Sequence, residues 1–268
     1  MSSLPTFLII GAMKAGTTSL FRHMGTHPDV SISKRKETDF FVGRHEFERG
    51  LDWYGSLFDP SRPARGEASP NYTKRHVWTG IAERIATTLP EVRLIFVARD
   101  PIMRITSHYM HNVAKGRENR PFTHAIIENR GYIQTSRYAY QLEPYVEQVD
   151  RDRIMFIDSD DLSNDTSTTL KAVFDFIGVR ADHEVTNLDT RFHMSTEKTR
   201  TSVLERRVGN PRVRALLRPL LPARLSERQP VQRPRPTAKD IDFLTGELRD
   251  DVAQFRALTG LAFAQWSL

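Results

Sequence analysis

A short apolar run that leads into a loop with two glycines constrains the fold of this chain most strongly. Phe7–Ile10 reads Phe-Leu-Ile-Ile, the loop GAMKAG follows at residues 11–16, and Thr17–Met24 has a helical pattern. An unbroken apolar run of this length is typical of a strand buried on both faces of a parallel sheet. A strand that passes through a glycine loop into a helix predicts an α/β fold.

The rest of the chain continues this alternation of strands and helices. The sequence predicts further strands at Val30–Ser33, Arg93–Ala98 and Arg153–Ile157, and helices at Met103–Val113, Thr168–Ile177 and Lys239–Leu258. Such alternation favours a parallel, doubly wound sheet. We therefore expect one α/β domain over residues 1–268, with a P-loop-like, three-layer arrangement of a central parallel sheet flanked by helices.

The loop after the first strand has the composition of an anion-binding site. Its glycines let the backbone turn tightly and approach a ligand, and the helix that follows directs free N–H groups and a favourable dipole toward it. A lysine adds a full charge, and three consecutive hydroxyl residues add donors. The candidate ligands are Lys14, Ala15, Gly16, Thr17, Thr18 and Ser19. The alternative is that the glycines only form a tight turn between strand and helix.

The position of the lysine distinguishes this loop from that of the nucleoside triphosphatases. In a Walker A loop the lysine directly follows the second glycine and reaches the β- and γ-phosphates. Here Thr17 follows Gly16, and the lysine lies inside the loop at Lys14. This spacing favours a ligand with one phosphate and one attached anionic group over a triphosphate.

A second candidate anion site follows the predicted strand Arg93–Ala98. Arg99 stands at the carboxyl end of that strand, where α/β sheets bind ligands, and Pro101 can begin a helix that carries Ser107 on its second turn. An arginine fork and a serine hydroxyl can hold one dianion from two sides. The spacing leaves equally open that Arg99 and Asp100 form a surface ion pair and that Ser107 faces water.

Both segments resemble motifs of one enzyme family. FLIIGAMKAGTTSL is similar to the 5'-phosphosulfate loop of sulfotransferases that use 3'-phosphoadenosine-5'-phosphosulfate (PAPS), especially the heparan sulfate sulfotransferases and their bacterial relatives. In that family the loop lysine binds the bridging region of the phosphosulfate, and the residues after it hold the 5'-phosphate. The resemblance places these roles on Lys14, Gly16, Thr17, Thr18 and Ser19.

The segment RDPIMRITSHY at residues 99–109 resembles the family's 3'-phosphate motif. This resemblance implies that Arg99 and Ser107 bind the 3'-phosphate. Lys198-Thr199-Arg200 is similar to a Lys-Gly-Arg loop that covers the nucleotide in the heparan branch, with Thr199 in place of the glycine. It implies Lys198 and Arg200 as two further nucleotide ligands, with membership of a basic surface segment as the alternative.

The transfer of a sulfuryl group needs a cation at the reacting centre and a base for the acceptor proton. The segment KETDFF at residues 36–41 resembles the family's Lys-Glu-Pro-His-Phe-Phe, in which the glutamate is the general base. The resemblance implies Glu37 as the base and Lys14 as the cation, with Asp39 as an assistant or substitute and His108 as a rival base. The alternative for Glu37 is a surface ion pair. GEASPNY at residues 66–72 resembles a further segment of the family, but Ala68 stands where the heparan enzymes have a second lysine.

The overall composition suits an anionic ligand. Lys and Arg outnumber Asp and Glu by 39 to 33, which does not require a nucleic-acid partner and equally fits a solvated basic surface. The absence of cysteine excludes disulfides, thiolate metal sites and a cysteine nucleophile. We expect no metal requirement. The N-terminus has neither a basic region nor an apolar run long enough for a signal peptide or membrane span, so we expect a cytoplasmic protein.

Residues 197–236 differ from the rest in being rich in Arg and Pro, which predicts a lid or a loosely packed excursion. An apolar helical face around residues 213–221 favours a packed surface helix over one that contacts a membrane or the acceptor. The alternative role of residues 205–236 is a peripheral contact with a membrane or with the acceptor.

The sequence thus predicts a PAPS-dependent sulfotransferase that acts on a hydroxyl or amine of a carbohydrate, lipid or small molecule and releases adenosine 3',5'-bisphosphate (PAP). One alternative is a P-loop kinase or NTPase, for which the apolar strand that ends at Asp158 would be the Walker B element. The other is a nucleotide-binding module without catalysis.

Overall fold

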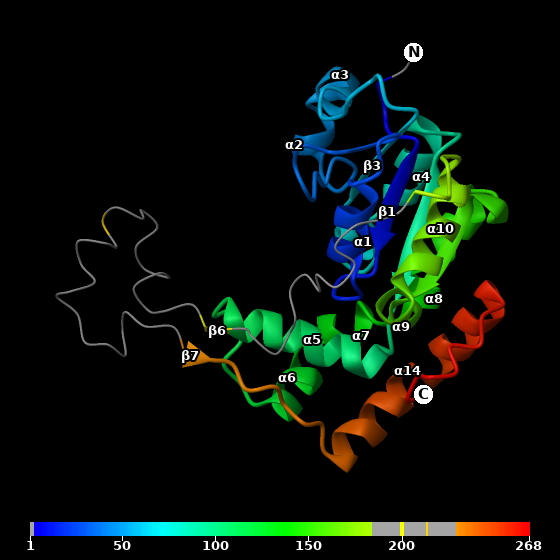
Figure 1. Cartoon of the computed structure of the whole chain (residues 1–268). Coiled ribbons are helices and arrows are strands. Elements are labelled where there is room, and N and C mark those ends of the chain that lie inside the picture. The colour runs from blue at the N-terminus through cyan, green and yellow to red at the C-terminus, as the bar shows by residue number, and fades with distance from the viewer. Residues whose placement is uncertain (1–2, 184–198, 201–212, 214–228) are drawn as a thin grey trace.

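Five parallel strands form the central sheet in the computed structural model, which describes residues 3–183, 199–200, 213 and 229–268 (Figure 1). Their order is β2-β3-β1-β4-β5. The strands are β1 (Phe7–Gly11), β2 (Val30–Ile32), β3 (Ala64–Ala68), β4 (Arg93–Ala98) and β5 (Ile154–Asp158). The order reverses beside β1, because the chain runs out to β2, returns through β3 and continues at β4 on the other side. Ligands of open α/β sheets bind at the carboxyl ends of the strands at such a point.

Four of these strands confirm the predicted ones, and β3 was missed. Its sequence, ARGEA, has no apolar run, yet all five residues are buried between β2 and β1. Arg65 is tolerated there because its guanidinium donates to backbone carbonyls, including that of Leu4 at 3.0 Å. Glu67 is tolerated because hydroxyl groups surround it, as described below. Long-range hydrogen bonds therefore make a strand of a segment whose own pattern does not indicate one.

Helices cover the sheet in two groups. On one side α1 packs against α10, and on the other α8 packs against α4 and α14. This arrangement confirms the predicted three layers. The helices named here are α1 (Thr17–Met24), α4 (Ile81–Thr88), α8 (Tyr138–Gln148), α10 (Thr166–Ile177) and α14 (Ala238–Thr259).

A second, smaller hydrophobic core lies below the sheet in the view of Figure 1. It joins α5 (Pro101–Ala114), α6 (Phe122–Glu128) and α7 (Gly131–Gln134) to the first half of α14. Ile105, Ile126 and Leu248 are among its fully buried members. This core holds α5 close to the carboxyl end of β4, from which α5 follows after two residues.

The remaining elements are short. They are α2 (Arg44–Phe47), α3 (Gly50–Gly55), η1 (Pro70–Thr73), η2 (Arg151–Arg153), α9 (Ser159–Asn164), β6 (Thr199–Arg200) and β7 (Gln229–Pro230). β6 and β7 pair antiparallel, and β6 lies against α5. Most of the predicted lid at 197–236 lies outside the described residues, and so do Lys198 and the side chain of Arg200.

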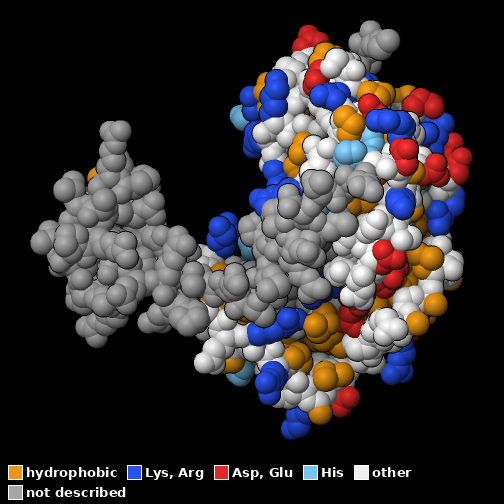
Figure 2. Space-filling view, in the orientation of Figure 1, with side chains coloured by type: hydrophobic (Ala, Val, Ile, Leu, Met, Phe, Trp, Pro, Cys, Tyr) orange, Lys and Arg blue, Asp and Glu red, His pale blue; other side chains and the backbone are white. Residues whose placement is uncertain are grey.

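The described surface shows how the charge is distributed. Basic side chains are scattered over the face in Figure 2, and acidic ones gather toward one edge of it. None of the helices that the structure describes combines the length and the apolar character needed to cross a bilayer.

Candidate active site

The loop between β1 and α1 has the backbone geometry of an anion-binding loop. Gly16 caps α1 with a φ of 106°, a value that favours glycine, and has no side chain that could accept from the first N–H groups of the helix. The N–H groups of Ser19 and Leu20 donate to the Gly16 carbonyl. These bonds form the first turn of α1, directly after the loop. Lys14 also has a positive φ, of 73°. The start of α1 therefore presents N–H donors and a positive dipole end to the space above β1.

Arg99 lies directly beside this loop. Its Nη1 donates to the carbonyl of Lys14 at 3.3 Å, and its own carbonyl accepts from the Tyr138 hydroxyl at 2.8 Å. Asp100 is buried and caps α5 by accepting from the N–H of Met103 at 2.8 Å. Burial lowers the pKa of Arg99 from its ordinary value. The two anchors predicted from distant segments are thus neighbours, and the alternative of a surface Arg99–Asp100 pair is wrong.

Arg104 is a buried residue beside the anion-binding loop, and the sequence analysis assigned it no role. Its side chain is fully buried and donates to Ser136 Oγ at 2.5 Å, to the Tyr132 carbonyl at 2.7 Å and to the Met13 carbonyl at 3.4 Å. It therefore fastens α5 and α7 to the anion-binding loop. Ser107 is one turn further along α5 on the same side of the helix, and it is also buried.

His108 is unsuited to act as the base. An arginine side chain can only donate, so the contact from Arg104 Nη1 at 3.4 Å makes His108 Nδ1 the acceptor. Burial, with the nearby charges of Arg104 and Lys74, lowers the pKa of His108 to about 2. The ring is therefore neutral at physiological pH and carries its proton on Nε2. It can donate a hydrogen bond there but cannot accept the acceptor's proton.

The two carboxylates predicted near the acceptor differ in their surroundings. Glu37 has a φ of 55°, its side chain is 47% exposed, and it pairs with Lys36 Nζ at 2.5 Å. Asp39 has a φ of 52° and is half-buried; its Oδ2 accepts from Asn71 Nδ2 at 3.0 Å. Burial raises the pKa of Asp39. Glu37 is thus the carboxylate that an incoming acceptor can reach from solvent.

Glu67 stabilises the acidic loop, which carries Glu37 and Asp39. It is fully buried, and its carboxylate accepts from the hydroxyls of Tyr72 at 2.5 Å, Thr38 and Ser69 at 2.6 Å, and Tyr54 at 2.8 Å. Burial raises the pKa of Tyr54 and Tyr72 well above the ordinary value, so both remain donors. The Ser69 hydroxyl in turn accepts from the N–H of Asp39 at 3.1 Å.

Replacing Glu67 by glutamine is expected to lower the free energy of unfolding by about 2 kcal/mol, because hydrogen bonds to a buried charge are lost. Chemical denaturation of the wild type and the variant measures this difference. Glu91→Gln is the matched control, since Glu91 is 82% exposed and pairs only at the surface with Arg153. A Glu67→Gln variant as stable as the control would contradict the role assigned to this carboxylate.

Arg99 and Arg104 bring positive charge to the anion-binding loop. Within the residues that the structure describes, neither Arg99 nor Arg104 forms an ion pair. Burial lowers the pKa of both, that of Arg104 to about 10. Buried charges are costly unless a partner neutralises them. The arrangement therefore suits a multiply charged anion that would lie between the loop and α5.

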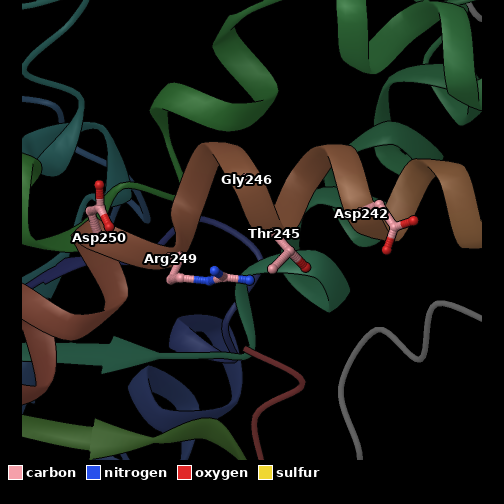
Figure 3. Close-up of a pocket in the computed structure, with 5 residues that line it drawn as sticks. All are labelled: Asp242, Thr245, Gly246, Arg249 and Asp250. Atoms are coloured by element: carbon pink, nitrogen blue, oxygen red, sulfur yellow. The ribbon is translucent and has the colours of Figure 1, made fainter.

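Two other features do not form part of this site. The carboxylate of Asp158 caps α9 by accepting from the N–H of Asp160 at 3.1 Å and also accepts from Trp266 Nε1 at 3.1 Å. These partners occupy it structurally, which weakens the kinase alternative. The depression in Figure 3 is lined by one helix alone, by Asp242, Thr245, Gly246, Arg249 and Asp250 of α14. It contains none of the predicted ligands.

Comparison with known proteins identifies the family to which this chain belongs. Residues 4–208 match the family described as Sulfotransferase domain. Heparan sulfate glucosamine 3-O-sulfotransferase 3B1 of Mus musculus is 31% identical over 187 residues, 66% of this chain and 47% of the relative. Bifunctional heparan sulfate N-deacetylase/N-sulfotransferase 1 of Caenorhabditis elegans is 25% identical over 189 residues, 64% of this chain and 22% of the relative.

One solved structure resembles nearly the whole chain. The sulfotransferase from Alicyclobacillus acidocaldarius is 25% identical, with a TM-score of 0.69 over 98% of this chain and 99% of that one. Against the mouse relative, by contrast, this chain spans about half of the relative's length. The family match covers β1, the anion-binding loop, Glu37 and α5 together, and the chain therefore belongs to the sulfotransferase domain family.

Proposed function

We propose that this chain transfers a sulfuryl group from PAPS to a hydroxyl or amine of a carbohydrate, lipid or small-molecule acceptor and releases PAP. The observation that carries the proposal is the contact between Arg99 and the carbonyl of Lys14. The fully buried Arg104 also reaches this loop, and it forms no ion pair within the described residues. Two anion sites in contact suit a ligand with a phosphate at each end. PAPS has a 3'-phosphate and a 5'-phosphosulfate, which matches this demand.

The residues divide between the two ends of the nucleotide. The 5'-phosphosulfate would bind the N–H groups and side chains at Lys14, Gly16, Thr17, Thr18 and Ser19, with Ala15 contributing its backbone. The 3'-phosphate would bind Arg99 and Ser107. Lys198 and Arg200 stay predicted ligands that cover the nucleotide. The start of α1 supports the first assignment, and the proximity of α5 to the loop supports the second.

The reaction would be an in-line displacement at sulfur. Glu37 takes the proton from the acceptor as the new bond from acceptor to sulfur forms, and the bond from sulfur to the bridging phosphate oxygen breaks with its electron pair on that oxygen. Lys14 stabilises the negative charge that develops there, as cations do in phosphoryl transfer. Glu37 is 47% exposed, so an acceptor can approach it from solvent.

Calorimetry with PAP tests the nucleotide assignment. We expect binding without Mg²⁺ and in the presence of a chelator, because protein cations supply the neutralising charge. Arg99→Ala should weaken PAP binding on the order of 100-fold, since it removes a charged donor to a phosphate. An absence of affinity for PAP, or tighter binding of Mg·ATP, would instead support the kinase alternative.

The acceptor is best sought with radiolabelled PAPS and a metabolite extract, followed by mass spectrometry of the labelled product. One heparan sulfate relative is named for 3-O- and the other for N-sulfation, so both hydroxyls and amines belong in the search. Label incorporated by the wild type but not by Lys14→Ala would support catalysis. Binding of PAPS without any transfer would favour the non-catalytic alternative. A cytoplasmic location and an acceptor or membrane contact through residues 205–236 stay part of the proposal.

A further inference from the structure

Lys74 occupies a position between the anion-binding loop and the acidic loop of Glu37 and Asp39. It directly follows η1, a short helix held at both sides: Thr73 Oγ1 donates to the carbonyl of Ile10 at 2.9 Å, and Asn71 Nδ2 donates to Asp39 Oδ2 at 3.0 Å. Ile10 belongs to the carboxyl end of β1. The backbone at Lys74 is thus fixed next to the start of the loop.

The two residues after Lys74, Arg75 and His76, contact α8. The N–H of Arg75 donates to Gln141 Oε1 at 2.6 Å, and Gln141 Nε2 lies 3.0 Å from His76 Nδ1, so both residues face α8. The Lys74 side chain lies among different groups. The charges that act on its pKa are Arg104, Asp39, Glu37 and Arg117, and Lys74 together with Lys14 acts on the pKa of His108. The backbone contacts of η1 with Ile10 and Asp39 place Lys74 beside the candidate active site, in agreement with these charges.

The charged Lys74 ammonium lacks a bonded partner within the described residues. The side chain is half-buried, and within the described residues its Nζ takes part in no hydrogen bond or ion pair. Removing an ammonium from water without a partner is unfavourable. Burial and the neighbouring charge of Arg104 lower its pKa, while Asp39 and Glu37 act in the opposite direction. A negatively charged ligand at this place would relieve the cost.

We propose that Lys74 contacts the sulfonate oxygens of the group in transfer. The proposal rests on the proposed function and adds a second catalytic cation to it. In the proposed mechanism Lys14 serves the leaving oxygen. Lys74 follows the segment that Asn71 joins to Asp39, so it would serve the side of the acceptor. In the displacement, negative charge spreads over the sulfonate oxygens between these two sides, where a fixed cation stabilises the transition state. Ala68, at the end of β3, offers no charge there.

Substitution of Lys74 separates this role from a structural one. We expect Lys74→Met to lower kcat on the order of 100-fold while the Kd for PAP changes less than about threefold, because PAP lacks the sulfonate. Lys171→Met is the matched control, since it removes an exposed lysine from α10 and should leave kcat unchanged. A Lys74→Met enzyme with the kcat of this control would overturn the proposal. PAP binding by the same variant would still support the proposed function.

The pH dependence of kcat provides a readout that a structural role would not change. Because the pKa of Lys74 is lowered in the folded protein, its ammonium loses its proton at a lower pH than an ordinary lysine does. We therefore expect kcat to fall at alkaline pH as Lys74 is deprotonated. Lys74→Arg keeps the charge at all accessible pH values. It should therefore retain measurable turnover and move the alkaline limb of the profile to higher pH. An alkaline limb in the same place for the wild type and Lys74→Arg would overturn the proposal, even if Lys74→Met proved unstable.

Discussion

Replacing Lys14 by alanine is expected to lower kcat on the order of 1000-fold, a larger effect than that expected for Lys74→Met or Ser19→Ala. The change removes a full positive charge from the point where the bridging oxygen acquires negative charge, and a preorganised donor at such a point is worth 10²–10³ or more in rate. Alanine keeps a Cβ at a backbone position whose φ is 73°, so the loop itself should persist. Turnover of radiolabelled PAPS measures the loss.

Ser19→Ala is the comparison for this prediction. Ser19 lies in the first turn of α1, and its N–H already donates to the Gly16 carbonyl at 2.9 Å. The substitution leaves that bond intact and removes one neutral hydroxyl donor, so we expect a loss on the order of 10-fold. Equal losses in Lys14→Ala and Ser19→Ala would contradict the assignment of Lys14 to the reacting centre.

Replacing Glu37 by glutamine is expected to lower kcat on the order of 100-fold or more, because the side chain keeps its size but can no longer accept the acceptor's proton. The Kd for PAP should remain close to that of the wild type. Glu37 is about half exposed and lies on a loop that Glu67 supports through Thr38 and Ser69, so the fold should tolerate the change. Single-turnover measurements with bound PAPS report the chemical step directly.

The neighbouring carboxylate provides the decisive comparison for Glu37. Asp39→Asn removes a group whose pKa is raised by burial and whose Oδ2 is already bound to Asn71. We expect a smaller loss than for Glu37→Gln. A larger loss would identify Asp39 as the base, and a Glu37→Gln enzyme with unaltered turnover would exclude the assigned mechanism. Glu91→Gln, an exposed change of the same kind, controls for the general effect of removing a carboxylate.

Several features of this protein could be predicted from the sequence because their signals are local. β1 and β4 are apolar runs whose burial on both faces requires that composition, and both are present at the expected residues. The anion-binding loop depends on glycines, a lysine and hydroxyls within nine consecutive residues. Arg99 depends on its place directly after β4. A strand that ends at the ligand-binding edge of a parallel sheet positions the next side chain there by geometry alone.

Other features depend on partners that are distant in sequence, and only the tertiary structure decided them. β3 is a strand because β1 and β2 pair with it, and Glu67 is buried because hydroxyls from three separate segments surround its carboxylate. Residues about thirty or more positions away form the surroundings of Arg104 and Lys74. A charged residue in such a local sequence most often lies on a solvated surface. Whether a charge is solvated or buried beside a ligand is set by long-range packing, which no short pattern encodes.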